Sequence, residues 1–248
     1  MRSKASGTLP PVSSLVVVPT YQEAENIEAF LRAVRNAVPD FDVLVVDDGS
    51  PDGTGELAEK VAADIGQISV LHRAGKAGLG SAYRAGFGRA LAEGYDLVVQ
   101  MDCDLSHDPA AIPSLLERIS DGADCVIGSR YVPGGSTPHW PWRRRVLSRY
   151  GNRYTSAVLK LGISDATSGY RAYRASTLET IDVASTESNG YVFMSEIAHR
   201  MVHAGMRIDE VPITFLDRQA GHSKMSGRII VESMFRVTLT GIRNSWSR

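Results

Sequence analysis

Residues 15–34 read LVVVPTYQEAENIEAFLRAV, and within this stretch the pattern of apolar residues changes its period. Leu15 to Pro19 form a short, valine-rich apolar run closed by proline, which predicts a buried strand. Further along, Ile27, Leu31 and Val34 recur at helical spacing, which predicts an amphipathic helix. The stretch therefore predicts a strand followed by a helix, with a polar loop between them.

The same change of pattern recurs along the first half of the chain. VLVVDDGS (residues 43–50) is a strand with a helix at 55–65, ISVLHR (68–73) is a strand with a helix at 81–94, and DLVVQMD (96–102) is a fourth strand. Continuous apolar strands that alternate with amphipathic helices indicate parallel βαβ units covered on both faces. The expected fold class is α/β, with a mostly parallel sheet flanked by helices.

The second half mixes helices and strands, with no linker, repeat or low-complexity tract. A single domain over residues 14–248 is therefore expected after a flexible arm at 1–13, with a nucleotide-binding half at about 14–108 and an acceptor half at about 109–248. The expected elements are helices at 111–119, 143–162, 190–205 and 225–242, strands at 124–132 and 207–216, and a Pro/Gly-rich loop at 133–142.

Composition excludes several classes of protein. Lys and Arg number 27 against 28 Asp and Glu, so the formal charge of −1 gives no overall attraction to nucleic acid. Only two cysteines occur, with no CxxC spacing, which fits a reducing compartment. No apolar run reaches the roughly 18 residues of a spanning helix. We expect a cytoplasmic protein, soluble or peripheral on the membrane.

Polar side chains follow each of the four predicted parallel strands. In such sheets, ligands bind outside the carboxyl ends of the strands, so these side chains are expected to face one crevice. They are Pro19, Tyr21 and Glu23 after the first strand, Asp47 and Asp48 after the second, His72, Arg73 and Lys76 after the third, and Asp102 and Asp104 after the fourth.

The fourth strand leads into MDCDLSHDP, which contains three aspartates. If the strand continues, Asp102 and Asp104 point to the same side, because alternate residues share a face. With Ser106 beside them, they suit a hard cation that takes oxygen ligands, Mg²⁺ or Mn²⁺. Asp108 and Pro109 are typical of a helix start, so Asp108 is expected to cap a helix.

Seven ordered motifs resemble the family-two glycosyltransferases of the GT-A fold, and among them the dolichol- and polyprenol-phosphate mannose synthases. The resemblance covers roughly residues 14 to 230. The motifs are PTYQEAENI, VVDDGSPDGT, RAGKAGLGSAYRAGF, MDCDLSHDP, GSRYVPGG, DATSGYRAY and RQAGHSK.

The resemblance implies a set of donor and metal residues. Asp104 would be the main metal ligand, with Asp102 and Ser106 as further candidates; several relatives carry Gln where this chain has Ser106. Arg130, Arg218 and Lys224 would face the diphosphate and act with Asp104 in catalysis. The residues that would bind GDP-mannose are Pro19, Tyr21, Glu23, Val46, Asp48, Asp102, Cys103, Asp104, Arg130, Arg218 and Lys224.

An acceptor that is a phosphate monoester removes the need for a general base. Such a phosphate has a second pKa of about 6 and is mostly dianionic at neutral pH, so it is already a nucleophile. The difficulty is to bring two anions together, which requires a metal and arginines. Trp140 and Trp142 suit a membrane interface. The residues predicted to receive the lipid phosphate are Arg143, Arg144, Arg145 and Ser168, with Arg149 and Arg153 following.

The resulting hypothesis is inverting transfer of mannose from GDP-mannose to a polyprenyl phosphate at the cytosolic membrane face, with peripheral attachment or an integral-membrane anchoring partner. A UDP-glucose enzyme that acts on the same lipid is the nearest alternative. An aspartyl-phosphate phosphatase and a non-catalytic nucleotide-binding subunit are further alternatives, and residues 140–153 can equally be a solvated basic helix packed through its tryptophans.

Overall fold

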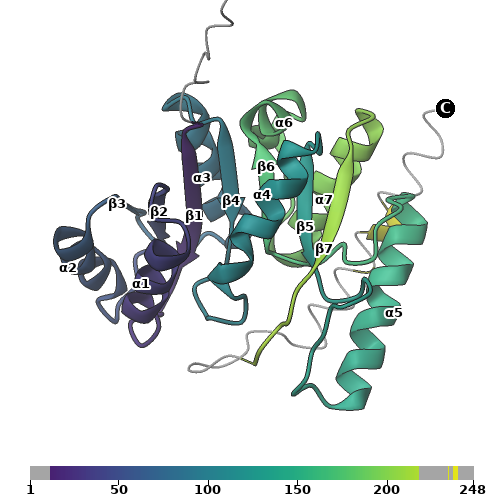
Figure 1. Ribbon diagram of the computed structural model, residues 1–248, viewed down its shortest axis with the longest axis horizontal. Coiled ribbons are helices and arrows are strands. Elements are labelled where there is room, and N and C mark those ends of the chain that lie inside the picture. Colours follow the sequence, from purple (N-terminus) through teal and green to yellow (C-terminus); the bar gives the residue numbers. More distant parts are fainter. Residues whose placement is uncertain (1–11, 218–233, 235–236, 240–248) are drawn as a thin grey trace, which may run out of the picture.

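Among the residues that the structure describes, seven strands form one sheet in the order β3-β2-β1-β4-β6-β5-β7 (Figure 1). The computed structural model describes residues 12–217, 234 and 237–239. The strands are β1 (Ser14–Thr20), β2 (Asp42–Asp47), β3 (Ile68–His72), β4 (Leu97–Gln100), β5 (Cys125–Ser129), β6 (Arg171–Arg174) and β7 (Ile208–Pro212).

Most neighbouring strands run parallel. The pairs β1 with β2, β1 with β4, β2 with β3 and β5 with β7 are parallel, whereas β6 runs antiparallel to both β4 and β5. The registers place Thr20 beside Asp47 and Val17 beside Gln100, so the first two strands and β4 end at the same edge. The predicted α/β fold with a mostly parallel sheet is confirmed.

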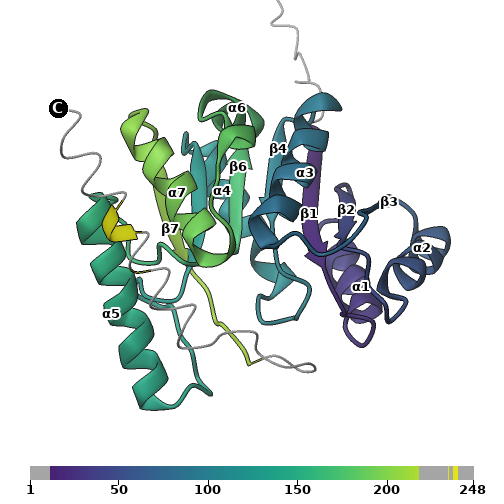
Figure 2. The same cartoon turned by 180° about the vertical axis from the view of Figure 1, so that it is seen from behind.

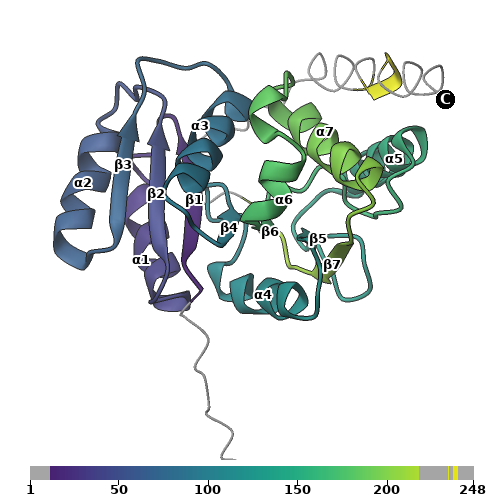
Figure 3. The ribbon, with the colours of Figure 1, turned by 90° about the horizontal axis from the view of Figure 1, so that it is seen from above.

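Helices cover both faces of the sheet, as Figure 3 shows from above. Alternate residues of β1 enter different cores: Leu15 and Val17 pack with α3, α6 and α7, while Val16 and Val18 pack with α1, α2 and α4. The helices are α1 (Ile27–Ala37), α2 (Thr54–Ile65), α3 (Leu79–Ala92), α4 (Ile112–Ser120), α5 (Trp142–Leu159), α6 (Ala175–Thr180) and α7 (Gly190–His203), with short 3₁₀ turns η1 (Pro109–Ala111) and η2 (Val183–Ser185).

Helix α1 shows why the opening pattern folds as predicted. Its residues Ile27, Phe30, Leu31 and Val34 are all fully buried against the sheet. Each such side chain stabilises the fold by roughly 1.5–3 kcal/mol through removal of apolar surface from water. Because these positions recur at helical spacing, one face of α1 carries most of its contribution to the core.

The second half follows the predicted elements with shifted bounds. Helix α5 covers Trp142–Leu159 and stands at the end of the molecule beyond β7, as seen from behind in Figure 2. The segment SGYRAY contributes β6, which inserts between β4 and β5. The predicted strand at 207–216 is shorter in β7. The predicted helix at 225–242 lies largely outside the described residues.

Candidate active site

The carboxyl ends of β1, β2 and β4 lie side by side and carry most of the predicted donor residues. Pro19 and Val46 are paired across β1 and β2. The side chain of Val46 is fully buried in the core under α3, as a Cβ placed at Gly86 would lie 3.3 Å from its Cγ2. Any contact of Val46 with a ligand would therefore involve its backbone.

The two aspartates after β2 have different surroundings. Asp47 accepts hydrogen bonds from the Thr20 hydroxyl (3.0 Å) and from the amide of Ser50 (3.0 Å), so it shapes the turn. Asp48 pairs with Arg73, whose Nη1 lies 2.5 Å from its Oδ1. Both partners of this pair are largely shielded from water. Asp48 is thus held in one orientation at the end of the strand, as a base or ribose ligand would need to be.

The loop after β1 packs on the turn after β2. The amide of Glu23 donates to the Thr54 hydroxyl (3.0 Å), and the Glu23 carboxylate accepts from the Asn26 amide group (2.9 Å). The ring of Tyr21 lies 4.3 Å from the ammonium of Lys76. The predicted residues of three strand ends therefore meet at one edge of the sheet.

The segment after β4 departs from the predicted geometry. The strand ends at Gln100, and the following residues form a turn in which Leu105 has φ of 57°. Asp102 accepts a hydrogen bond from the Tyr83 hydroxyl (2.9 Å), and Asp104 accepts from the amide of Ser106 (3.0 Å). The predicted strand at 96–102 is too long, since β4 ends at Gln100 and a turn positions both carboxylates.

Of two further residues in this segment, Cys103 is buried and Asp108 is exposed. The side chain of Cys103 packs in the core, where burial raises the pKa of its thiol well above its usual range. A donor contact at this position would come from the backbone. Asp108 accepts from the amide of Ala110 (2.9 Å), with Pro109 at the first position of η1, so the predicted cap is confirmed.

The oxygen atoms near Asp104 fit a hard divalent cation. The hydroxyl of Ser106 is fully buried, and within the described part of the chain it has no hydrogen-bond partner. A buried hydroxyl in this state is costly unless a ligand completes it. The described residues contain no group of three His, Cys, Asp or Glu side chains that could hold a metal ion, and the ligand set Asp102, Asp104 and Ser106 stays a prediction.

His107 adjoins this position but faces the interior. Its ring packs against Tyr170 (5.2 Å between centroids) and Phe215 (5.1 Å). Burial lowers the pKa of His107 to about 4, so the imidazole is neutral at physiological pH. Because the ring is enclosed, it is not placed to take a proton from an acceptor.

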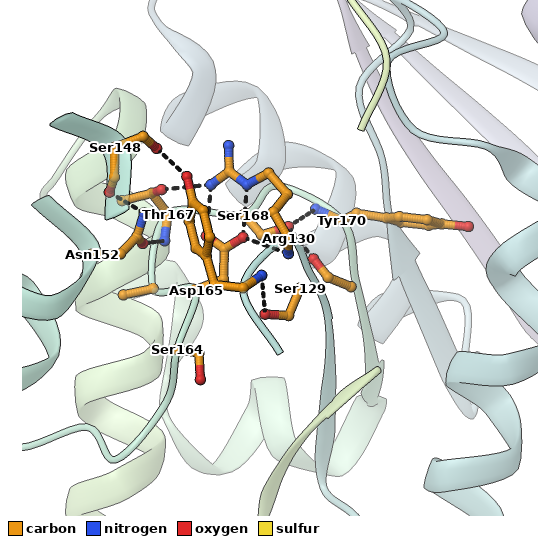
Figure 4. A network of polar contacts seen from close by, with 12 residues as sticks. Ser129, Arg130, Ser148, Asn152, Ser164, Asp165, Thr167, Ser168 and Tyr170 are labelled. Carbon is orange, nitrogen blue, oxygen red and sulfur yellow. Dashed lines mark hydrogen bonds and ion pairs between the residues drawn. The ribbon is translucent and has the colours of Figure 1, made fainter. Parts of the chain in front are cut away.

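Arg130, which follows β5, is held by a buried carboxylate (Figure 4). Its Nε lies 2.7 Å from Oδ2 of Asp165 and its Nη2 lies 2.6 Å from Oδ1, so the ion pair is bidentate. Nη2 also donates to the Thr167 hydroxyl (3.0 Å). Burial raises the pKa of Asp165, but the charge and hydrogen bonds of Arg130 outweigh it and hold the pKa below its usual range.

The sequence interpretation did not single out Asp165 as the partner of Arg130, nor Arg171 as a core residue. Arg171 is completely buried and donates to the carbonyl groups of Ala166, Ser168 and Met194. Through these hydrogen bonds Arg171 links the loop before β6 to helix α7. An apolar spacing pattern carries no signal for either role.

Ser168 has a structural environment. Its hydroxyl donates to the carbonyl of Gly128 (2.7 Å) and accepts from the amide of Tyr170 (3.3 Å). The side chain is 2% exposed. The predicted contact of Ser168 with an acceptor phosphate stays a prediction that this arrangement does not favour.

The basic segment at the start of α5 is only partly as expected. Trp140 is 7% exposed, so its predicted place at a membrane interface is wrong, because it packs on Phe215 and under Arg144. Trp142 is 64% exposed. Arg143 and Arg145 are also exposed, while Arg144 pairs with Asp217 (3.1 Å). The predicted residues Arg218 and Lys224 lie outside the described residues.

Solved structures share this fold. The chain superposes on a glucosyl-3-phosphoglycerate synthase from Mycobacterium tuberculosis with a TM-score of 0.67 and 18% identity, over 94% of this chain and 79% of that one. A mannosyltransferase from Pyrobaculum calidifontis, in complex with GDP-Man and Mn²⁺, gives a TM-score of 0.65 and 19% identity over 93% of this chain and 64% of that one. The fold is that of the GT-A glycosyltransferases.

Sequence comparison then gives the family. Residues 15–182 match the profile of glycosyl transferase family 2. The polyprenol monophosphomannose synthase of Mycolicibacterium smegmatis is 50% identical over 240 residues, 96% of this chain and 91% of the relative. The undecaprenyl-phosphate mannosyltransferase of Micrococcus luteus is 50% identical over 232 residues, 94% of this chain and 95% of the relative. The chain belongs to glycosyl transferase family 2.

Membership in this family makes the chain a glycosyltransferase, and it excludes the phosphatase and non-catalytic alternatives. In the described part of the chain, no helix has both the length and the apolar character needed to cross a membrane.

Proposed function

We propose that this enzyme transfers mannose from GDP-mannose to a polyprenyl phosphate, with inversion at the sugar carbon. The observation that carries the proposal is the 50% identity, over almost the whole chain, to relatives named for mannosyl transfer to polyprenol or undecaprenyl phosphate. The complex of a GT-A mannosyltransferase with GDP-Man supports the choice of donor.

In this proposal the strand ends bind the donor. Asp48, fixed by Arg73, and the Tyr21 ring would hold the guanosine part. Asp104, with Asp102 and Ser106, would hold Mg²⁺ or Mn²⁺. When bound, the cation supplies positive charge that stabilises the leaving diphosphate.

The chain's own residues then favour a reaction without a general base. His107 is enclosed, and its lowered pKa makes it a weak base, so it does not accept a proton from the acceptor. A dianionic phosphate needs no such help. Arg130 lies beside the same edge of the sheet, and its donors would be oriented by Asp165 toward anionic oxygens.

The proposal includes peripheral attachment to the membrane through α5. Between Trp142 and Leu159 this helix has five arginines and no acidic residue. Four large apolar side chains on it are exposed: Trp142, Val146, Leu147 and Tyr150. Interfacial helices combine these features, since apolar side chains enter the headgroup layer while arginines contact lipid phosphates. We also propose that the contact is on the cytosolic face; an integral-membrane anchoring partner remains part of the hypothesis.

One assay tests the proposal. The purified chain is incubated with labelled GDP-mannose or UDP-glucose, a polyprenyl phosphate, and Mg²⁺ or Mn²⁺, with and without EDTA. We expect label in the lipid fraction from GDP-mannose only, and none with EDTA. Transfer from UDP-glucose alone would support the glucosyl alternative, and no transfer from either donor would refute the proposal.

A further inference from the structure

A pocket separate from the strand-end site lies between α5 and the loop that follows it. Its volume is about 560 Å³. It adjoins the Arg130 and Asp165 pair but includes neither residue. The pocket is lined by Tyr131, Arg149, Arg153, Ser156, Ala157, Gly162, Ile163 and Ser164.

Two arginines give the pocket its charge. Arg149 and Arg153 are four residues apart on α5, so their side chains share one face of the helix. Neither guanidinium forms an ion pair with any residue that the structure describes. The Arg149 guanidinium lies 5.6 Å from the centre of the Tyr131 ring, which places it against the pocket wall.

Two carboxylates close to the lining residue Ser164 already have partners within the protein. Asp165 is buried and paired with Arg130. Glu210 accepts hydrogen bonds from the amides of Ser164 (2.7 Å) and Asp165 (3.0 Å). The lining itself contains no acidic residue. The side chains that line the pocket therefore carry two positive charges and no negative charge, although the formal charge of the whole chain is −1.

The polar groups around the arginines suit an anion. Ser156 and Ser164 bring hydroxyl groups, which can donate to anionic oxygens. At the end of α5 the carbonyl of Ser156 accepts from the amide of Leu161 (2.9 Å), so it is capped. The Tyr131 hydroxyl donates to Ser148 (2.6 Å), and burial raises the pKa of Tyr131, so the phenol stays neutral.

We propose that this pocket binds a phosphate-bearing ligand, whose phosphate group lies between Arg149 and Arg153. Guanidinium groups bind phosphate through paired, charge-assisted hydrogen bonds, and two on one helix face offer more donors than a single surface arginine. The ligand has two conceivable sources, a membrane lipid headgroup or a soluble phosphate compound. The proposal does not depend on the donor and acceptor of the proposed reaction.

Binding measurements on the full chain test this proposal. Glycerol 3-phosphate is titrated by calorimetry as the soluble probe, and cosedimentation with phosphatidylcholine vesicles, with and without phosphatidylglycerol, probes the headgroup. The pocket variant is Arg149→Gln/Arg153→Gln. Arg89→Gln/Arg118→Gln loses the same charge at exposed positions of α3 and α4, and Arg143→Gln/Arg145→Gln loses it on α5 outside the pocket.

We expect the pocket variant to bind one probe at least about tenfold more weakly than the intact chain, since charged hydrogen bonds are lost. If the pocket variant binds glycerol 3-phosphate more weakly than the intact chain, the ligand of the pocket is a soluble phosphate compound. A loss confined to phosphatidylglycerol vesicles, and larger than that of Arg143→Gln/Arg145→Gln, assigns a headgroup. Losses equal to those of the comparison variants in both assays would overturn the proposal, and circular dichroism verifies that each variant folds.

Discussion

Asp165 illustrates how one buried carboxylate controls an arginine of the candidate site. Its side chain is 0% exposed and that of Arg130 is 9% exposed. Removing one partner of such a pair leaves the other charge buried without compensation, which is strongly unfavourable. The pair also fixes the direction of the Arg130 donors, so stability and activity depend on the same contact.

Asp165→Asn is expected to lower the free energy of unfolding by about 3 kcal/mol at neutral pH. The pKa of Asp165 is lowered in the folded state, so its contribution is present above about pH 3.8 and is lost as the pH falls below that value. Urea denaturation of the variant and the intact chain at several pH values measures this.

Asp209→Asn is the matched control, because Asp209 pairs with the exposed Arg207 at the surface. Such pairs contribute about 1 kcal/mol or less. A loss at Asp165 no larger than that at Asp209, or one independent of pH down to pH 3, would contradict the assigned pair.

Asp104 provides the residue-scale test of the metal site. Asp104→Asn keeps the size of the side chain but removes its charge, so we expect cation-dependent transfer to fall by at least about a hundredfold, given typical losses for charge-stabilising groups. Activity is measured across a range of Mn²⁺ concentrations. Asp108→Asn is the control, because Asp108 caps η1 and asparagine can cap it as well. This variant should retain near-normal activity. Equal losses of activity in both variants would argue against a metal role for Asp104.

At the residue scale, the sequence was informative where a residue lies at a strand end. Asp48 could be placed because parallel strands bring their carboxyl ends to one edge, whereas Asp104 lies in a turn beyond the end of β4. The burial of Cys103 and the pairing of Arg130 with Asp165 could not, since both depend on how a turn and a distant loop pack in three dimensions. Ser106 was already a candidate ligand from the sequence, but only the structure shows that its hydroxyl is buried without a hydrogen-bond partner among the described residues.

Among the elements, α3 shows how closely a helix can approach the sheet. Gly86 faces β1, and a Cβ placed there would lie 2.3 Å from Cγ1 of Val17. Gly86→Ala is therefore expected to destabilise the fold by about 1–3 kcal/mol through overpacking. Thermal denaturation followed by circular dichroism measures the change.

Gly88, on the same helix, is the control for this substitution. A Cβ at Gly88 meets no atom within 4 Å, so Gly88→Ala should stabilise the helix by about 0.5–1 kcal/mol. Equal effects at the two positions would show that α3 does not pack against β1 as described.

The elements themselves were predicted better than their arrangement. Helices α1 to α5 and α7 and the first four strands follow from apolar periodicity, because each buries one face or one run of residues, whereas α6 was not predicted. The insertion of β6 between β4 and β5, antiparallel to both, has no local signal, since a four-residue strand can pair in either direction. The sheet order of the second half was therefore found only in three dimensions.

Acceptor binding can be tested by substituting the exposed arginines at the start of α5. Arg144 packs on Trp140 and pairs with Asp217, so its removal would disturb the fold as well as binding. Arg143→Ala/Arg145→Ala is expected to raise the KM for polyprenyl phosphate about tenfold, with little change for GDP-mannose, because charged contacts to phosphate are lost. Steady-state kinetics with each substrate varied in turn measures both constants. Equal increases for donor and acceptor would count against an acceptor role.

For the whole molecule, charge is distributed unevenly. Acidic and basic residues almost balance over the chain, with 28 against 27, yet α5 alone carries five arginines and no carboxylate. This helix stands at one end of the molecule, beyond β7 (Figure 1). An overall composition close to neutral therefore gives no indication of the local attraction to anionic surfaces that this end of the fold provides.

The membrane contact of the intact enzyme should depend on both charge and apolar area. We expect binding to phosphatidylglycerol vesicles to weaken as salt is raised, because salt screens the arginines. Trp142→Ser/Val146→Ser should weaken binding further at every salt concentration, because two exposed apolar side chains no longer enter the headgroup layer. Val12→Ser, which alters an exposed apolar residue outside α5, should leave binding unchanged. If cosedimentation is equally strong for the α5 variant and the intact chain, α5 is not the surface that contacts the membrane.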